Sequence, residues 1–421
     1  MAVLDNPVNY GDLKKFVVTL DGKDISQGVT EARIFQDIFT PCWTGSVTID
    51  DKSNWLMRLP IKLGSMVTID VQTVLNGPGD GEKKFTMMVY AITDRVIISG
   101  NYQTYVLRLA TEDFLINQKT RVSRSFNQVK ATDAVADIVS QNFSDSQLSN
   151  VDACDNSVST IIPNVSPFNA IAWFCKHATH SNAADYVFFQ QDENMYTMKS
   201  MENLYASTNN SCGITFTQFP AGMKDDIGNP LYDYSVSMSK FAVQHFDGMA
   251  NLSAGMYKNK KVSFDYINKT WTEKVFTYGD DCPADAQYKS WDTKFFDDAE
   301  DSNITFMPKH PGMADSGPSY LDAQDTWEPS RKTAFMKLNQ EKLTFQVPGS
   351  VGFWQCIGKN CVVNLPSHQD FDTGNPLDKY RKGNYMISAI AHIIGKDVYV
   401  CNFECLKKRM ETTPSQDGQL V

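Results

Sequence analysis

The chain has 421 residues, of which 42% are hydrophobic and 21% are charged, and its formal net charge is −10. This composition is typical of a soluble globular protein, and the length predicts about two to four domains. The acidic balance argues against a protein that grips nucleic-acid phosphates, because such proteins carry clustered Lys and Arg. No run of about 18 apolar residues occurs, so no membrane span is expected.

The two chain-wide signals of cellular compartment agree with each other. Residues 1–8 lack the basic start and apolar core of a signal peptide. The nine cysteines are an odd number spread over the whole length, which favours a reducing compartment over a disulfide framework. We therefore expect the protein to be made and folded in a cytoplasm.

Alternation with a period of two dominates residues 1–112. Residues 67–71 alternate apolar and polar side chains, which places the apolar ones on one face of a strand. Two longer apolar runs, 85–98 and 102–109, are separated by Ser-Gly-Asn at 99–101, a composition that favours a tight turn. Short strands divided by turn residues predict an antiparallel β-barrel in residues 1–112.

From residue 113 the pattern changes to helix and strand together. Apolar residues recur at helical spacing in 132–143, and Thr132 is the predicted N-cap. Ser-Pro at 166–167 predicts the start of a second helix. Its apolar face is expected to carry Phe168, Ile171, Ala172 and Cys175. With a hairpin at 186–199, these elements predict a small α+β domain in residues 113–206.

A second β-barrel is predicted from two separated parts of the chain, residues 207–244 and 335–410. Residues 342–347 alternate cleanly, and the apolar run 385–394 turns at Gly-Lys-Asp into the alternating run 398–406. The strands expected in this barrel are 211–219, 231–241, 342–347, 361–365, 385–394 and 398–406.

The remaining segments are polar. Residues 245–334 are expected to form an insertion domain of irregular structure, in which 280–301 contains eight acids and forms a solvated face. Residues 327–341 are predicted to be helical and to lead into the last barrel. The C-terminal residues 411–421 hold too few apolar side chains to fold alone, so they form a loose end or a segment that a partner orders.

The two predicted barrels echo each other in sequence. "VYAITDRVII…YVLRL", beginning at Val89, and "MISAIAHII…YVCNF", beginning at Met386, both read as a long strand, a tight turn and a partner strand once one residue is gapped. This internal similarity predicts two related barrels in one chain.

No residue set in the sequence predicts catalysis or a cofactor. His177 and His180, at the end of the second predicted helix, are three apart and so are the best candidates for metal ligands, but no Glu or Cys completes a recognised pattern. Cys356, Cys361, Cys401 and Cys405 lie on predicted strands without a Cys-x-x-Cys knuckle, which favours buried apolar packing. Neither a Gly-x-Ser-x-Gly elbow nor a Walker motif occurs. The prediction is no catalytic, cofactor-binding or metal site.

A series of short segments resembles the central baseplate hub proteins of contractile-tailed bacteriophages, whose relatives include the hub part of type VI secretion spikes. The matching residues are 34–50, 59–61 with Gly64, 91–95, 162–171 and 383–392. Together they cover most of the chain in the right order. The long acidic insertion and the short tail depart from the family pattern.

The resemblance implies a homotrimer in which each chain gives two tail-tube-like barrels, so that three chains form a ring of pseudo-sixfold symmetry. Such a ring joins the sixfold tail tube to the threefold central spike, contacts other baseplate proteins and forms part of the DNA channel in the virion, without catalysis. From the net charge we expect an acidic or neutral lumen that genomic DNA passes without specific binding. We expect the tail 411–421 to contact the spike. The alternatives are a tail-associated cell-wall-degrading enzyme and a hub-like protein of a non-contractile tail.

Overall fold

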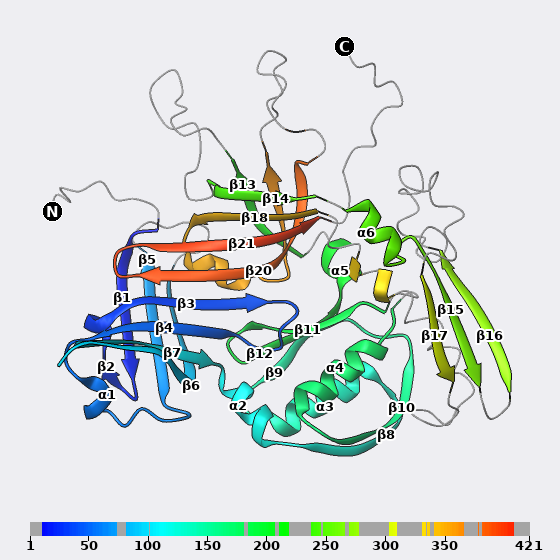
Figure 1. Cartoon of the computed structure of the whole chain (residues 1–421), viewed down its shortest axis with the longest axis horizontal. Coiled ribbons are helices and arrows are strands. Elements are labelled where there is room, and N and C mark those ends of the chain that lie inside the picture. The colour runs from blue at the N-terminus through cyan, green and yellow to red at the C-terminus, as the bar shows by residue number, and fades with distance from the viewer. Residues whose placement is uncertain are drawn as a thin grey trace, which may run out of the picture.

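A computed structural model gives the structure of the chain (Figure 1). The residues that it describes are 11–73, 81–100, 102–180, 184–206, 210–218, 237–245, 247–265, 269–277, 303–309, 331–333, 335–336, 341–365, 378 and 381–407. Strands predominate among them, and the expected mainly β class with α+β parts is confirmed.

One sheet of thirteen strands forms the body of the described chain. Seven strands come from the N-terminal part: β1 (Leu13–Leu20), β2 (Lys23–Asp24), β3 (Val29–Asp37), β4 (Thr44–Asp51), β5 (Met66–Thr73), β6 (Glu82–Ser99) and β7 (Tyr102–Ala110). Six come from the later part: β13 (Ser211–Thr217), β14 (Ser239–Gln244), β18 (Glu341–Pro348), β19 (Asn360–Asn364), β20 (Gly383–Gly395) and β21 (Tyr399–Lys407).

The two halves of this sheet have the same strand order. The first half reads β3-β4-β7-β6-β5-β1, with β2 at its end, and the second reads β14-β18-β21-β20-β19-β13. A short helix follows the second strand of each series, α1 (Trp55–Arg58) after β4 and η7 (Val351–Gln355) after β18. One pairing differs, because β13 runs parallel to β19 whereas β1 runs antiparallel to β5. The sequence echo between the two hairpins therefore reflects a repeated topology.

The two halves share a single hydrophobic core. Strands such as β5 and β7 bury every second residue, as the period of two requires. Trp354 from η7 lies with its ring centroid 4.7 Å from that of Phe85 and 5.5 Å from that of Trp43, so aromatic side chains of both halves meet at one point. The seam is the antiparallel pairing of β3 with β20. It makes one continuous sheet of what the sequence predicted as two barrels.

The α+β unit packs beside the first half (Figure 1). Its elements are α2 (Glu112–Lys119), β8 (Val122–Lys130), α3 (Ala131–Asn142), β9 (Gln147–Val151), β10 (Ser157–Val165), α4 (Pro167–His177), β11 (Tyr186–Asp192), β12 (Met195–Ser200) and α5 (Met201–Ala206). β8 pairs with β10, and β12 lies between β11 and β9. The helices α3 and α4 bury their apolar faces in a second core that includes Phe143 and Phe174.

Two details of the predicted helices were wrong. Helix α3 starts at Ala131 with Lys130 at the N-cap, so Thr132 lies in its first turn, where its hydroxyl contacts the Cys154 sulfur at 3.6 Å. In α4, Ser166 is the N-cap and Pro167 the first helical residue, as predicted. Ala172, however, is exposed and Phe174 is buried, because the buried stripe of the helix follows 170–171 and 174–175.

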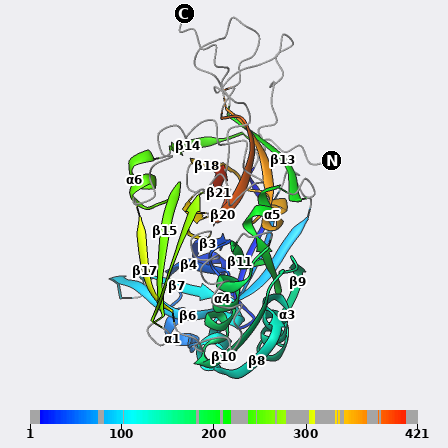
Figure 2. The same cartoon turned by 90° about the vertical axis from the view of Figure 1, so that its right-hand side faces the viewer.

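The insertion is more ordered than its polar composition indicated. Helix α6 (Gly248–Ser253) is capped by Asp247, whose carboxylate accepts from the backbone N–H groups of Met249 and Ala250. It precedes a three-stranded sheet of β15 (Lys258–Asp265), β16 (Thr270–Thr277) and β17 (Ile304–Lys309). Figure 1 shows this sheet at the periphery, on the side away from β1 and β2, and Figure 2 views the molecule from the side of this sheet. The expectation of irregular structure was wrong for these residues.

Several expected features lie wholly or partly outside the described residues. The acidic segment 280–301 and the tail 411–421 are among them, as is most of the strand expected at 231–241. Of the helix expected at 327–341, residues 331–333 and 335–336 are helical, whereas Glu341 begins β18.

Candidate functional site

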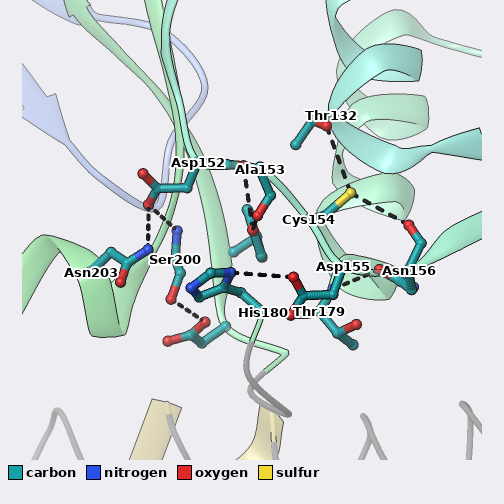
Figure 3. A network of polar contacts seen from close by, with 12 residues as sticks. Thr132, Asp152, Ala153, Cys154, Asp155, Asn156, Thr179, His180, Ser200 and Asn203 are labelled. Carbon is teal, nitrogen blue, oxygen red and sulfur yellow. Dashed lines mark hydrogen bonds and ion pairs between the residues drawn. The ribbon is translucent and has the colours of Figure 1, made fainter.

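The two histidines that were candidate metal ligands do not share a helix face. Helix α4 ends at His177, and Ala178 already has extended backbone angles, so His180 lies beyond the helix. The His177 ring stacks on Trp173 at 4.0 Å, and its Nδ1 lies 2.7 Å from the Trp173 carbonyl oxygen. His180 Nδ1 faces the Asp155 carboxylate at 3.8 Å, which is too long for a hydrogen bond (Figure 3). Each ring therefore has its own neighbour.

The polar network around His180 holds the segment 152–156 against its surroundings (Figure 3). Asp152 accepts from Asn203 Nδ2 at 3.1 Å and from the Ser200 backbone N–H at 3.3 Å. The Asn156 side chain accepts from the Thr179 N–H at 3.0 Å. These bonds tie the segment to β12, to α5 and to the residues that follow α4. The polar side chains here therefore stabilise the fold.

The four cysteines of the second half are buried and lie in or beside the core: Cys356, Cys361, Cys401 and Cys405. Burial raises the pKa of the Cys401 thiol to about 12, and it also raises the pKa of Cys361 well above its usual range. Protonated thiols are poor metal ligands and pack as small apolar groups. Within the described parts of the chain, no three His, Cys, Asp or Glu side chains gather as a metal would require.

The buried carboxylates of the α+β unit serve as hydrogen-bond acceptors. Asp113 accepts from Ser146 Oγ at 2.5 Å and from the Tyr196 hydroxyl at 2.8 Å, and burial raises the pKa of its carboxyl group. Asp185 accepts from Ser200 Oγ and from the Glu202 N–H, both at 2.8 Å. Each carboxylate links different elements of the α+β unit, as buried polar groups do.

None of the helices in the described ranges is long and apolar enough to span a membrane.

The seam between the two halves contains a fully buried polar network. Residues 389–395 of β20 pair with 31–37 of β3. Gln36 Nε2 donates to the Trp354 carbonyl oxygen at 3.1 Å, which leaves Gln36 Oε1 to accept from His392 Nε2 at 3.1 Å. His392 Nδ1 lies 2.6 Å from the Tyr399 hydroxyl. All four side chains are 1% exposed or less. The network joins side chains of both halves across 356 residues of sequence.

The environment of His392 fixes its charge and its tautomer. Its ring lies flat on the Trp354 ring, with centroids 3.8 Å apart, and burial lowers its pKa to about 3. The imidazole is therefore neutral at physiological pH. Because Gln36 uses its amide N–H on the Trp354 carbonyl, the His392 proton is on Nε2, and Nδ1 accepts from Tyr399. The β3–β20 seam therefore encloses a neutral polar network within the core.

At the other end of the first half, the sheet has an edge with no described partner strand. The residues of β6 up to Met88 pair with β5, but beyond that point only β7 pairs with β6. The free part carries large apolar side chains that are exposed: Ile92 (38%), Val96 (56%), Ile97 (67%) and Ile98 (55%). An unpaired apolar strand edge is a surface that favours pairing with another chain.

Comparison with solved structures identifies proteins of the same fold. The tail protein from Neisseria meningitidis MC58 superposes with a TM-score of 0.56 at 10% identity, covering 93% of this chain and 96% of that one. The 43 kDa tail protein of prophage MuSo2 from Shewanella oneidensis superposes with a TM-score of 0.55 at 12% identity, covering 94% and 98%. The chain has a phage tail-protein fold.

This fold agrees with the resemblance seen in sequence. No protein-family model matches the chain, and no curated protein matches it either. At 10–12% identity the similarity establishes the fold, and the role of the chain has to be argued from its own surfaces.

The residues of the seam and of the open edge were missed as sites in the sequence. Gln36 and His392 looked like single polar residues within apolar strands, and only the three-dimensional pairing joins them. The open edge did carry a signal: Val-Ile-Ile at 96–98 interrupts the alternation just before a turn. Three consecutive apolar residues at a strand end put apolar side chains on both faces, which indicates contact with something outside the strand pair.

Proposed function

We propose that this protein is a structural subunit of a phage tail: a baseplate central hub, of which three copies form a ring between the tail tube and the central spike. The observation that carries the proposal is the repeat within the main sheet. One chain contains two units of the same strand order, joined through β3 and β20. Three chains would supply six such units, so a threefold assembly presents near-sixfold symmetry to a sixfold tube.

In this proposal each part of the chain has its own role in the assembly. Residues 1–112 form the first ring unit, and 207–244 with 335–410 form the second. The α+β domain 113–206 and the insertion 245–334 lie outside the repeat and are available to other baseplate proteins. The tail 411–421 contacts the spike.

The face of the sheet opposite the core is suited to line a DNA channel. Several of its charges are paired: Lys342 with Glu404, Arg33 with Glu31, and Arg108 with Asp94. Between these pairs lie neutral groups such as Gln346, which donates to Asn402 at 3.0 Å. Paired charges weaken the attraction of this face for phosphates, which supports passage of genomic DNA without specific binding.

The proposal assigns the protein to the baseplate of the virion tail, assembled in the host cytoplasm, with no enzymatic activity of its own. The support is the fold shared with tail proteins and the use of the buried histidines and carboxylates as structural groups. Wall-degrading activity would belong to another component of the particle.

Native mass spectrometry of the purified chain, alone and with its spike, tests the role. We expect a species of three times the chain mass, and no clearing of a cell-wall suspension in a turbidity assay. A strictly monomeric protein in complex with the spike would overturn the hub assignment. Clearing that a single carboxylate substitution abolishes would favour the enzyme alternative. A channel lined mainly by Lys and Arg in the assembled ring would refute passive passage of DNA.

A further inference from the structure

The two long hairpins of the main sheet can be matched residue by residue. In the first, a bulge shifts the register between Val89, opposite Leu109, and Ala91, opposite Arg108. In the second, the same shift occurs between Ile387, opposite Cys405, and Ala389, opposite Glu404. Just before each bulge, β6 pairs with β5 at Met88 and β20 pairs with β19 at Met386. Position 89 therefore corresponds to 387, and Ile92 to Ile390.

Beyond these positions the first hairpin has one extra residue. Asp94 and Arg95 of β6 occupy the place of His392 alone, and Asp94 adopts a positive φ of 53° as a bulge residue. The register then resumes, since Val96 lies opposite Thr104 as Ile393 lies opposite Val400. Val96 thus corresponds to Ile393, and Ile97 to Ile394.

Corresponding residues of the two hairpins differ sharply in exposure. In β20, residues 389–395 pair with β3, and Ile390 is 1% and Ile394 0% exposed. Their counterparts Ile92 and Ile97 are 38% and 67% exposed, on an edge to which no described strand is added. Among the described residues, the first half has no equivalent of the strand that β3 provides to the second.

The counterpart of β3 in the second half is β14. β14 pairs with β18 through Val243 and Leu343, as β3 pairs with β4 through Ile34 and Gly45. No strand of the described chain pairs with the other edge of β14, and Phe241 on this strand is 37% exposed. Within the described part of the chain, β14 is therefore equivalent to the strand that is absent beside β6, and neither of these two edges is paired. Within one chain these two edges lie at opposite ends of the path β14-β18-β21-β20-β3-β4-β7-β6.

We propose that the free edge of β6, residues 92–98, is the docking site for β14 of a second copy of this chain, which adds as an antiparallel strand. The register of the internal seam, Ile393 opposite Arg33, places Val96 opposite Ala242 of the second copy. This brings Ile97 beside Phe241 of that copy. The pairing would satisfy the open backbone groups of both strands and cover the apolar row.

This pairing rests on the proposed function, and it specifies which strands join neighbouring copies in the ring. Each interface between copies would reproduce the β3–β20 seam, so that internal and external joints alternate around the ring. The external joint differs in its polar groups. Charged Asp94 and Arg95 stand where the seam buries neutral His392, so the edge stays hydrated until a second copy covers it.

Cysteine cross-linking tests the register directly. In a background carrying Cys212→Ser and Cys282→Ser, Val96→Cys and Ala242→Cys are combined in one chain. The first background change removes the one partly exposed thiol among the described residues, and the second removes the cysteine that lies outside them. Opposite residues of an antiparallel pair have Cα atoms about 4.5–5.5 Å apart, within disulfide range. Mild oxidation should yield covalently linked trimers on a non-reducing gel. The matched control combines Val96→Cys with Ala172→Cys, an exposed position on α4, and should remain unlinked.

A second variant pair separates this proposal from the ring itself. Ile97→Lys should raise the protein concentration at which the trimer forms by at least about tenfold, whereas Ile161→Lys, at an isoleucine of similar exposure on β10, should not change it. Trimers that survive Ile97→Lys and give no cross-link would refute this pairing and leave the hub standing. A wild-type protein that is monomeric at every concentration and with its spike would refute both.

Discussion

The two halves of the main sheet differ at one strand edge, and that difference shows how one template is used in two ways. In the second half, the edge of β20 is covered by β3, and Ile394 is fully buried. In the first half, the same edge of β6 has no partner strand among the residues that the structure describes, and Ile97 is 67% exposed. The covered edge holds a neutral polar network around His392, whereas the open one holds the charged pair Asp94–Arg108. The same strand edge is thus buried within the chain in the second half and is accessible to another chain in the first.

The largest loss of stability is expected from a substitution at Trp354, where both halves meet. Its ring contacts Trp43, Phe85 and His392, so Trp354→Ala leaves a cavity shared by the two halves. We expect a loss of about 3–5 kcal/mol in the free energy of unfolding, measured by urea denaturation. The control Trp271→Ala, at an exposed tryptophan of β16, should change it by less than about 0.5 kcal/mol. Equal effects would mean that the seam is not part of the core.

The corresponding isoleucines of β20 and β6, Ile394 and Ile97, test the difference in burial between the two edges. Ile394→Ala should cost about 2–5 kcal/mol, because it empties a buried position. Ile97→Ala should cost less than about 0.5 kcal/mol in the isolated chain, because its side chain is already largely in water. Both are measured by thermal and urea unfolding at concentrations too low for assembly. A large loss for Ile97→Ala under these conditions would show that the edge is covered within the chain.

These contrasts also show what the sequence could and could not predict. Alternation located β5, β18 and β21, because each buries one face against a shared core. The echo of the two hairpins was one residue out of register at its start, because the structure matches Val89 to Ile387, but its single gap corresponds to the extra bulge residue of β6. β15 was not predicted, since Lys258–Lys261 is polar on both faces. The parallel pairing of β13 and the contact of Gln36 with His392 depend on partners far away in sequence, so no local pattern marks them.

A smaller effect is expected from the polar network of the seam. Gln36→Leu leaves the His392 Nε2–H and the Trp354 carbonyl without partners in the core, which should cost about 1–3 kcal/mol in urea denaturation. The control Gln346→Leu removes an exposed hydrogen bond to Asn402 on the opposite face and should cost less than about 0.5 kcal/mol. If the two variants were equally stable, the buried network of Gln36 and His392 would contribute no more to the free energy of unfolding than an exposed hydrogen bond.

The smallest effect is the pH dependence of the seam. Burial lowers the pKa of His392 to about 3, below its unfolded value of about 6.5. The unfolded state therefore binds more protons than the folded state between these two values, so the stability is fully present above pH 6.5 and is lost as the pH falls toward 3. From pH 7 to 6 the contribution of His392 should fall by about 0.7 kcal/mol.

Denaturation curves of the wild type and of His392→Gln, recorded at both pH values, isolate this contribution. The difference in free energy of unfolding between the two proteins should shrink by that amount at pH 6. A difference that does not change with pH would show that His392 titrates normally and that the seam admits water.

The most direct measurement is a cryo-EM reconstruction of the purified ring, refined with threefold symmetry alone. We expect six similar sheet units around one channel, with β3–β20 pairing inside each chain and β6–β14 pairing between chains. Copies that meet through the α+β unit or the insertion, with the β6 edge still open to solvent, would contradict this expectation.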